Sequence, residues 1–304
     1  MPSPSLIDRI AGWPWAETVT VLFGFAWGAM LGSFLNVVAH RLPRGESLAR
    51  HRSRCPRCGA AIRASDNVPV VGWLRLRGRC RDCRAPIAVR YPLVEAGCGV
   101  LVMVLVWAEL VGGGRWLPRL AEVFPGGIDR LLRGDWPLLL TCCLHAAAVL
   151  TIVTWSLLDL DGSRPAWSLA ALPLPLVLAC VVAVPVSAPG GVLPTGADWP
   201  PGWPRAQAAV ASLTGALAGW ALGRGGTTAG VRFGLPLLGG VLGWQVVMIV
   251  AAATATVVRA TTARCGMPAA AAGLVLAAAG TLGIALQSPL RAAVASALAA
   301  ILGP

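Results

Sequence analysis

Hydrophobic residues fill most of this chain in long uninterrupted runs, and one long polar segment separates the first run from the rest. Apolar runs of about 18 residues or more predict helices that cross a bilayer, because about 20 helical residues span its hydrocarbon core. We therefore expect an all-α polytopic membrane protein with about eight transmembrane helices. The expected spans are residues 18–39, 93–111, 137–158, 166–186, 206–222, 233–258, 269–286 and 289–302.

The polar segment divides the chain into three parts. Residues 1–40 contain the first span, residues 41–92 form an arginine-rich loop, and residues 93–304 contain the remaining spans. The loop holds 13 of the 25 basic residues and only three acidic ones. Since the loops that stay in the cytoplasm carry the excess of basic residues, we expect this loop to be cytoplasmic.

Composition supports the membrane class and argues against a nucleic-acid-binding protein. Hydrophobic residues make up 56% of the chain and charged residues only 12%, which excludes an ordinary soluble domain. The formal net charge of +12 would suit nucleic acid, but the loop that carries much of it has no interleaved aromatic residues for base stacking. We therefore expect the lipid bilayer, and no nucleic acid, as a partner.

Two Cys-x-x-Cys pairs stand in the loop: Cys55 with Cys58, and Cys80 with Cys83. Four thiolates paired in this way suit a tetrahedral Zn²⁺ ion, which each pair can approach from a tight turn such as the one that Gly59 allows. Two disulfides are the alternative, but a cytoplasmic loop is kept reduced. We predict a structural, zinc-ribbon-like site with four cysteine ligands, because such a site leaves no open position for substrate.

The first span has small residues at every fourth position, Gly24, Gly28 and Gly32. Such spacing lays a smooth stripe along one helix face and predicts close packing against another helix of the membrane.

Several short motifs in order give the chain a family resemblance. GSFLNVVAHRLP at residues 32–43, the paired Cys-x-x-Cys motifs, DNVPVVGWLRLRGRCRDC at residues 66–83 and RYPLVE at residues 90–95 together resemble the bacterial type IV prepilin peptidases. The close similarity covers residues 28–95. Over the remaining two thirds of the chain, only the number and layout of the spans agree.

The resemblance implies a bifunctional enzyme of the bacterial inner membrane, connected with type IV pili and type II secretion. Members of the family are aspartic endopeptidases that cleave the short basic leader of prepilins or pseudopilins at the cytoplasmic face. They then methylate the new amino terminus with S-adenosylmethionine. Cleavage in the family needs two aspartates, and such a pair shares one proton and holds the attacking water.

The family's first aspartate motif is present and its second is not. The stretch LLDLD places Asp159 at the first catalytic position with Asp161 beside it, although the Leu-Pro-Asp that should follow is missing. The second position falls on Gly226 or on Gly230, depending on the alignment, and no Asp or Glu occurs after Asp198. We therefore expect impaired or lost peptidase activity, as in a pseudoenzyme.

Three alternatives stay open at this point. Asp161 or Glu95 could act as a substitute acid, although Asp161 would project about 200° around a helix from Asp159. The methyltransferase activity could remain alone, since the zinc-loop region is intact. A non-enzymatic membrane scaffold or transporter is the third alternative, but the later spans show no paired intramembrane charges and no internal repeat.

Overall fold

The computed structural model describes residues 15–48, 53–112, 136–163, 203–224, 228–242, 244–265 and 271–286, with the single residues 132, 134, 268 and 290. Every regular element within these residues is a helix, which confirms the all-α class. They form two compact units: Val21–Met103, and Met1–Thr20 together with Val104–Pro304. The expected division of the chain at residues 40 and 92 stays a prediction.

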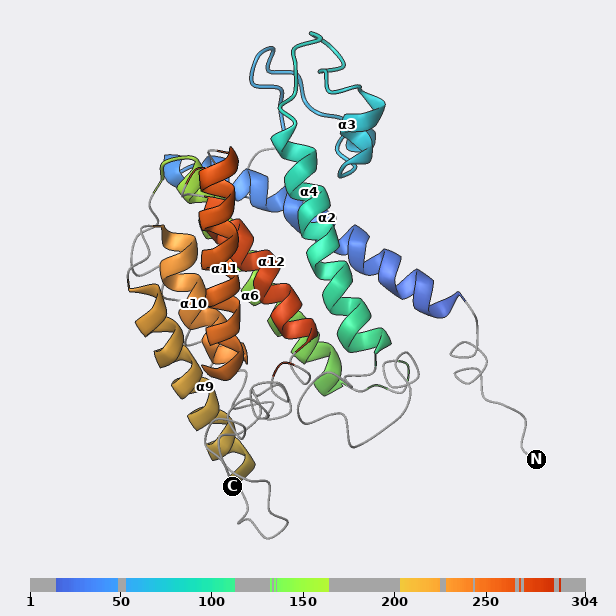
Figure 1. Ribbon diagram of the computed structural model, residues 1–304. Coiled ribbons are helices and arrows are strands. Elements are labelled where there is room, and N and C mark those ends of the chain that lie inside the picture. Colours follow the sequence, from blue (N-terminus) through green and yellow to red (C-terminus); the bar gives the residue numbers. More distant parts are fainter. Residues whose placement is uncertain are drawn as a thin grey trace, which may run out of the picture. The chain divides into compact units, whose positions relative to one another are not determined.

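Two helices frame the unit Val21–Met103, α2 (Ala16–Arg41) and α4 (Arg90–Leu105), and the polar loop connects their neighbouring ends (Figure 1). A Cβ atom on Gly28 would lie 2.6 Å from the carbonyl oxygen of Cys98, and one on Gly32 would lie 3.0 Å from Cα of Glu95. Only glycine allows the two backbones to approach this closely. The close packing expected on the first span is therefore confirmed at Gly28 and Gly32.

The other face of α2 carries large apolar side chains that the unit leaves exposed. Leu22, Phe23 and Trp27 are more than half exposed, at 59%, 66% and 51%. A water-soluble protein rarely exposes so continuous an apolar face, whereas lipid tails would cover it.

Within the loop the regular structure is short. It consists of η1 (Leu42–Arg44), η2 (Ala64–Asp66) and α3 (Val71–Arg75), joined by turns. A segment with so little apolar core needs another source of stability, which the paired cysteines can provide.

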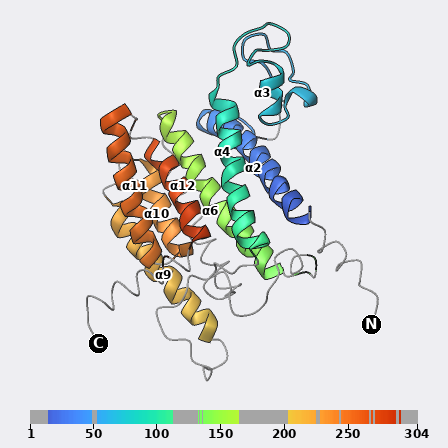
Figure 2. The same ribbon diagram turned by 45° about the vertical axis from the view of Figure 1, so that its right-hand side comes forward.

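The second unit is a helical bundle. It contains the π-helical turn η3 (Val106–Val111), α6 (Trp136–Leu160), α9 (Trp203–Gly223), α10 (Ala229–Leu242), α11 (Trp244–Cys265) and α12 (Ala272–Ala285). Figures 1 and 2 show α9, α10, α11 and α12 beside one another, with α6 next to α10 and α12. Helices α9 and α10 approach each other closely, since a Cβ atom on Gly219 would lie 2.1 Å from the carbonyl oxygen of Leu235.

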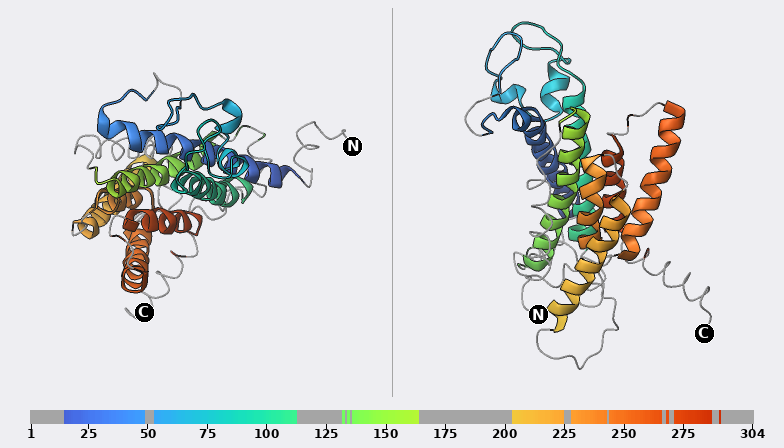
Figure 3. Two further views of the ribbon diagram at one scale, coloured as in Figure 1. Left: turned by 90° about the horizontal axis from the view of Figure 1, so that it is seen from above. Right: turned by 90° about the vertical axis from the view of Figure 1, so that its left-hand side faces the viewer.

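The expected span 233–258 is wrong, because the structure divides it into α10 and α11. A Cβ atom on Gly273, in α12, would lie 3.0 Å from Cα of Gly230, so α12 begins where α10 begins. The seven Cα–Cα steps from Cys265 to Ala272 reach at most about 25 Å, whereas one continuous helix from 229 to 265 would be about 55 Å long. Helices α10 and α11 therefore run in opposite directions, as the views in Figure 3 allow the reader to follow.

Three described helices are long and apolar enough to cross a membrane: Ala16–Arg44, Arg90–Val111 and Leu138–Leu160. Four further apolar helices are shorter: Ala209–Gly223, Ala229–Leu242, Val246–Thr262 and Ala272–Ala285. Together they agree with a polytopic membrane protein. The expected spans 166–186 and 289–302 lie outside the described residues, apart from residue 290.

Candidate functional site

The four predicted metal ligands come together in the loop. The sulfur atoms of Cys55, Cys58, Cys80 and Cys83 all lie within 4.8 Å of one another, and those of Cys55 and Cys83 are 3.8 Å apart. A tetrahedral zinc ion with Zn–S bonds of about 2.3 Å places its sulfur ligands about 3.8 Å apart. The cluster therefore has the size of a metal site with four cysteine ligands, and the described cysteines form no disulfide.

Two similar turns present these thiols. The Cys55 N–H donates to Ala60 O at 2.9 Å, and the Cys80 N–H donates to Ala85 O at 2.8 Å. Each turn has a residue with positive φ after its second cysteine, Gly59 at 72° as predicted and Arg84 at 59°. Backbone N–H groups of Cys58 and Arg57 lower the pKa of the Cys55 thiol to about 6, which favours the thiolate that binds metal.

An ion-pair network ties the two halves of the loop together. The Asp66 carboxylate accepts hydrogen bonds from Arg81 at 2.5 Å and from Arg75 at 2.6 Å, while its own side chain is only 4% exposed. The guanidinium groups of Arg81 and then Arg75 hold the pKa of Asp66 well below its ordinary value. The carboxylate is therefore ionised at neutral pH and links η2 to α3 and to the second cysteine turn.

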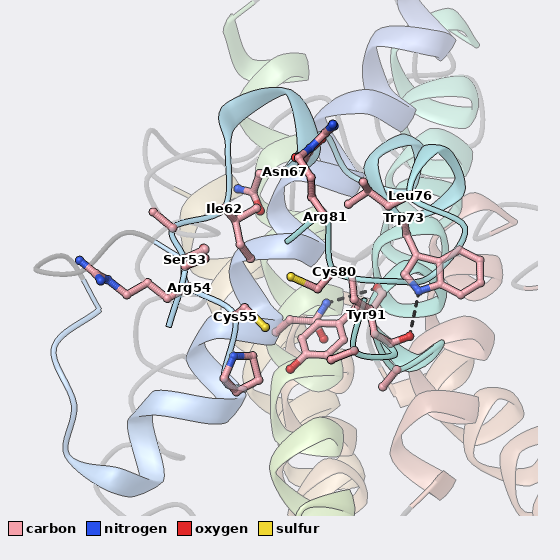
Figure 4. A pocket seen from close by; sticks show the side chains of 18 of the residues that line it. Ser53, Arg54, Cys55, Ile62, Asn67, Trp73, Leu76, Cys80, Arg81 and Tyr91 are labelled. Atoms are coloured by element: carbon pink, nitrogen blue, oxygen red, sulfur yellow. Dashed lines mark hydrogen bonds and ion pairs between the residues drawn. The ribbon is translucent and has the colours of Figure 1, made fainter. Parts of the chain in front are cut away.

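A cavity of about 600 Å³ opens beside the cysteine cluster, and all its lining residues belong to the unit Val21–Met103. In Figure 4 the side chains of Cys55 and Cys80 lie at its centre, with Arg81 above them and Tyr91 below. Asn36 and Glu95, from α2 and α4, complete its polar lining. The Asn36 amide donates to the backbone oxygen of Tyr91 at 3.3 Å.

Glu95, one of the two predicted substitute acids, forms a hydrogen bond to a strained turn of the loop. Its Oε2 accepts a hydrogen bond of 2.7 Å from the N–H of Val70, which has a φ of 63°. The Val71 N–H donates to Pro69 O at 2.6 Å, so Val70 is the central residue of a γ-turn with positive φ. A β-branched residue rarely adopts this conformation, and the Glu95 carboxylate stabilises it.

We therefore expect Glu95→Ala to destabilise the loop by about 1–3 kcal/mol, because it leaves the partly buried Val70 N–H without its acceptor. Glu95→Gln keeps an oxygen acceptor and should cost less, and Val70→Gly should stabilise the turn by relieving the positive φ. Thermal unfolding, followed by tryptic cleavage at the loop arginines, measures all three variants. Equal stability of the alanine and glutamine variants would contradict this role of Glu95.

Asp159 lies in the last turn of α6 and caps another helix. Its Oδ1 accepts a hydrogen bond of 3.1 Å from the Ala229 N–H, and its Oδ2 accepts one of 2.9 Å from the Gly230 N–H. Both donors belong to the first turn of α10, whose unpaired N–H groups and positive dipole end favour an anion. Gly230, one of the two positions aligned with the second aspartate, therefore lies beside Asp159, while Gly226 lies outside the described residues.

Helix packing fills the space beside Gly230. A Cβ atom there would lie 2.7 Å from Ser156 Oγ, 3.0 Å from Cα of Gly273 and 3.6 Å from Asp159 Oδ2. Three helix ends thus meet where the resemblance expects the second carboxylate. Asp161 lies in the exposed turn after α6, and its suggested catalytic role stays a prediction.

The structure also pairs two polar residues that the sequence did not connect. Glu109 in η3 and His145 in α6 are 1% and 0% exposed, and Oε1 of Glu109 lies 2.5 Å from Nδ1 of His145. The outer atoms of the pair, Glu109 Oε2 and His145 Nε2, have no hydrogen-bond partner among the described residues. Ionisable residues are rare inside apolar spans, so Glu109 and His145 could have been singled out from the sequence. Their spacing in the sequence does not show that they contact each other.

We expect His145→Leu to destabilise the bundle by about 3–5 kcal/mol, because it leaves the buried Glu109 unpaired. The double variant with Glu109→Leu removes both polar groups and should recover most of that loss. Melting of the detergent-solubilised protein measures the difference. If the double variant were as unstable as His145→Leu alone, the loss of stability would not come from an unpaired Glu109, and this explanation would be wrong.

Comparison with known proteins shows similarity over part of the chain. Residues 26–109 match the family described as the bacterial peptidase A24 N-terminal domain. A prepilin leader peptidase/N-methyltransferase of Myxococcus xanthus is 54% identical over 80 residues, which are 26% of this chain and 24% of that protein. Over these residues, the chain is similar to the bacterial prepilin peptidases. No solved structure matches the chain.

Two other relatives show comparable similarity. The type 4 prepilin-like proteins leader peptide-processing enzyme of Escherichia coli O78:H11 is 43% identical over 124 residues, 34% of this chain and 45% of that protein. A prepilin leader peptidase/N-methyltransferase of Stutzerimonas stutzeri is 42% identical over 110 residues, 29% of this chain and 38% of that protein. The match thus spans less than half the length of these relatives. The family's N-terminal domain, as matched here, includes the cysteine cluster and Glu95.

Proposed function

We propose that this protein binds prepilin or pseudopilin leader peptides and has impaired or lost peptidase activity. The strongest support is the hydrogen bond of 2.9 Å from the Gly230 N–H to Asp159 Oδ2. A backbone amide stands there in place of a second carboxylate. Without a partner acid, Asp159 cannot share a proton across an attacking water, and loss of one member of such a unit costs several orders of magnitude in rate.

Binding of a leader peptide does not require the pair of carboxylates that cleavage requires. The leaders of the family are short and basic, so an acidic contact at the membrane edge can hold them, and Asp159 and Asp161 are the acidic residues at the end of α6. We assign the protein to the bacterial inner membrane as a multi-pass protein. The arginine-rich loop then lies in the cytoplasm, because of its charge.

The test combines binding with cleavage. Purified protein in detergent is titrated with fluorescent leader peptides, and peptide mass is recorded in the same samples. We expect saturable binding that weakens in Asp161→Asn, together with unchanged peptide mass. Cleavage would establish an active peptidase with a substitute acid, and Asp161 and Glu95 would then be tested first. The absence of both binding and cleavage would favour a scaffold.

A second candidate is N-methyltransferase activity alone, with S-adenosylmethionine as cofactor. The cavity of about 600 Å³ favours it, since small-molecule sites are of this size and have a few convergent polar groups. The Glu95 carboxylate could face the sulfonium cation of the cofactor. Calorimetric titration with S-adenosylmethionine tests the candidate: binding that weakens in Asn36→Ala supports it, and the absence of binding to folded, metal-loaded protein removes it.

We further propose that the metal of the cysteine cluster is zinc with a structural role. Cys55, Cys58, Cys80 and Cys83 would hold it, and the bound ion would keep the two turns of the loop together. Since all four positions are taken by protein sulfur, the metal would take no part in peptide chemistry.

A further inference from the structure

Six arginines surround a second hollow of the loop. Its volume is about 730 Å³, and its basic lining consists of Arg63, Arg75, Arg77, Arg79, Arg81 and Arg84. Asp66 pairs with Arg75 and Arg81, and the part of the loop that the structure describes provides no ion pair for the other four. The hollow therefore has a large positive charge that its own residues do not neutralise.

The six arginines are not all explained by a need to neutralise the negative charge of the cysteine thiolates. Arg79, Arg81 and Arg84 flank the second cysteine pair and could offset a zinc-thiolate centre. Arg63 and Arg75, by contrast, each stand five residues from the nearest cysteine of the sequence. From Ser53 to Arg90 there are nine arginines and two aspartates, so positive charge remains even beside a fourfold thiolate zinc site, whose net charge is about −2.

Apolar side chains are exposed next to the arginines. Val68, Val71 and Leu74 are 46%, 56% and 60% exposed, and the last two lie on one face of α3, three residues apart. Arg75, which lines the hollow, is the last residue of the same helix. Exposed apolar side chains beside cationic ones are typical of surfaces that lie in the headgroup region of a membrane.

The loop is also connected at both ends to helices that can cross a membrane. Arg41 at the end of α2 and Arg90 at the start of α4 mark its two ends, and both helices are apolar enough to cross a bilayer. We infer that the arginine hollow binds the phosphate headgroups of anionic lipids, with Val71 and Leu74 in contact with the upper acyl region.

The test uses the full-length protein in neutral detergent and counts bound lipids by native mass spectrometry. The lipids are phosphatidylglycerol and, for comparison, phosphatidylcholine. The hollow variant is Arg63→Gln, Arg77→Gln and Arg79→Gln, and the matched control carries the same charge change outside the hollow, at Arg44, Arg54 and Arg57. Metal content and melting temperature confirm that both variants are folded.

We expect the hollow variant to bind phosphatidylglycerol roughly 100-fold more weakly, because the contributions of three arginines at an anionic surface multiply. The control should retain most of its affinity, and Val71→Ser with Leu74→Ser should weaken binding in the folded protein. Equal losses in the hollow variant and the control would overturn the inference. Equal affinity for phosphatidylcholine, displacement by millimolar inorganic phosphate, or preference for a single-stranded oligonucleotide would also overturn it.

Discussion

Restoring a carboxylate opposite Asp159 is expected to produce cleavage of leader peptides. A Cβ atom on Gly230 would lie 3.6 Å from Asp159 Oδ2, so the carboxylate of Gly230→Asp can reach Asp159. Ser156 Oγ would lie 2.7 Å from the new Cβ, and Ser156→Ala removes this clash. Gly273 Cα, at 3.0 Å, would then need to move by only a few tenths of an ångström.

The rate of leader cleavage should increase when a second carboxylate can share a proton with Asp159. We expect Gly230→Asp with Ser156→Ala to cleave leader peptides roughly 10³-fold faster than the unaltered protein, since the members of a catalytic pair act as a unit. Peptide mass as a function of time is the measurement. Gly230→Asn with Ser156→Ala is the matched control, because the Asn amide has nearly the same shape as the Asp carboxyl group but no ionisable proton. A folded aspartate variant no faster than this control would contradict the assignment of Gly230.

Loss of one cysteine of the cluster is expected to unfold the loop. Cys80 is buried between the two turns, and Cys80→Ser removes one of four ligands. Structural zinc contributes about 10–16 kcal/mol in zinc-finger peptides, far more than the small apolar core of this loop can replace. The variant should lose its zinc, and its many arginines should become sites of rapid tryptic cleavage.

Elemental analysis and limited proteolysis measure this effect together. Cys143→Ser is the matched control, because Cys143 is an exposed cysteine of α6 outside the cluster. The control should keep one zinc per chain and a protected loop. A protected loop in zinc-free Cys80→Ser protein would contradict a structural role of the metal.

The cysteine cluster could be predicted because it depends on residues that are close together in the sequence. Two Cys-x-x-Cys pairs define a four-ligand site with few alternatives, and Gly59 has the positive φ that its turn requires. The assignment of Asp159 as the first catalytic aspartate, made from the LLDLD stretch, stays a prediction. Its role as a cap of α10 depends on a residue 71 positions later and could not be read from spacing.

Features that depend on packing between distant segments were missed. The run 233–258 contains no charged residue, so hydropathy alone does not separate α10 from α11. The Glu109–His145 pair joins residues 36 positions apart. The positive φ of Val70 contradicts the local preference of a β-branched residue, and it exists because Glu95, 25 positions away, accepts the hydrogen bond of its N–H.

The most direct test of the central claim is cleavage by the unaltered protein. Purified protein with a full complement of zinc is incubated with a set of prepilin-like leader peptides, Asp159→Asn is the control, and peptide mass is the readout. We expect both proteins to leave the peptides intact, because our proposal puts Gly230, which offers only a backbone N–H group, at the position of the second catalytic carboxylate. Cleavage by the unaltered protein that disappears in Asp159→Asn would contradict the claim.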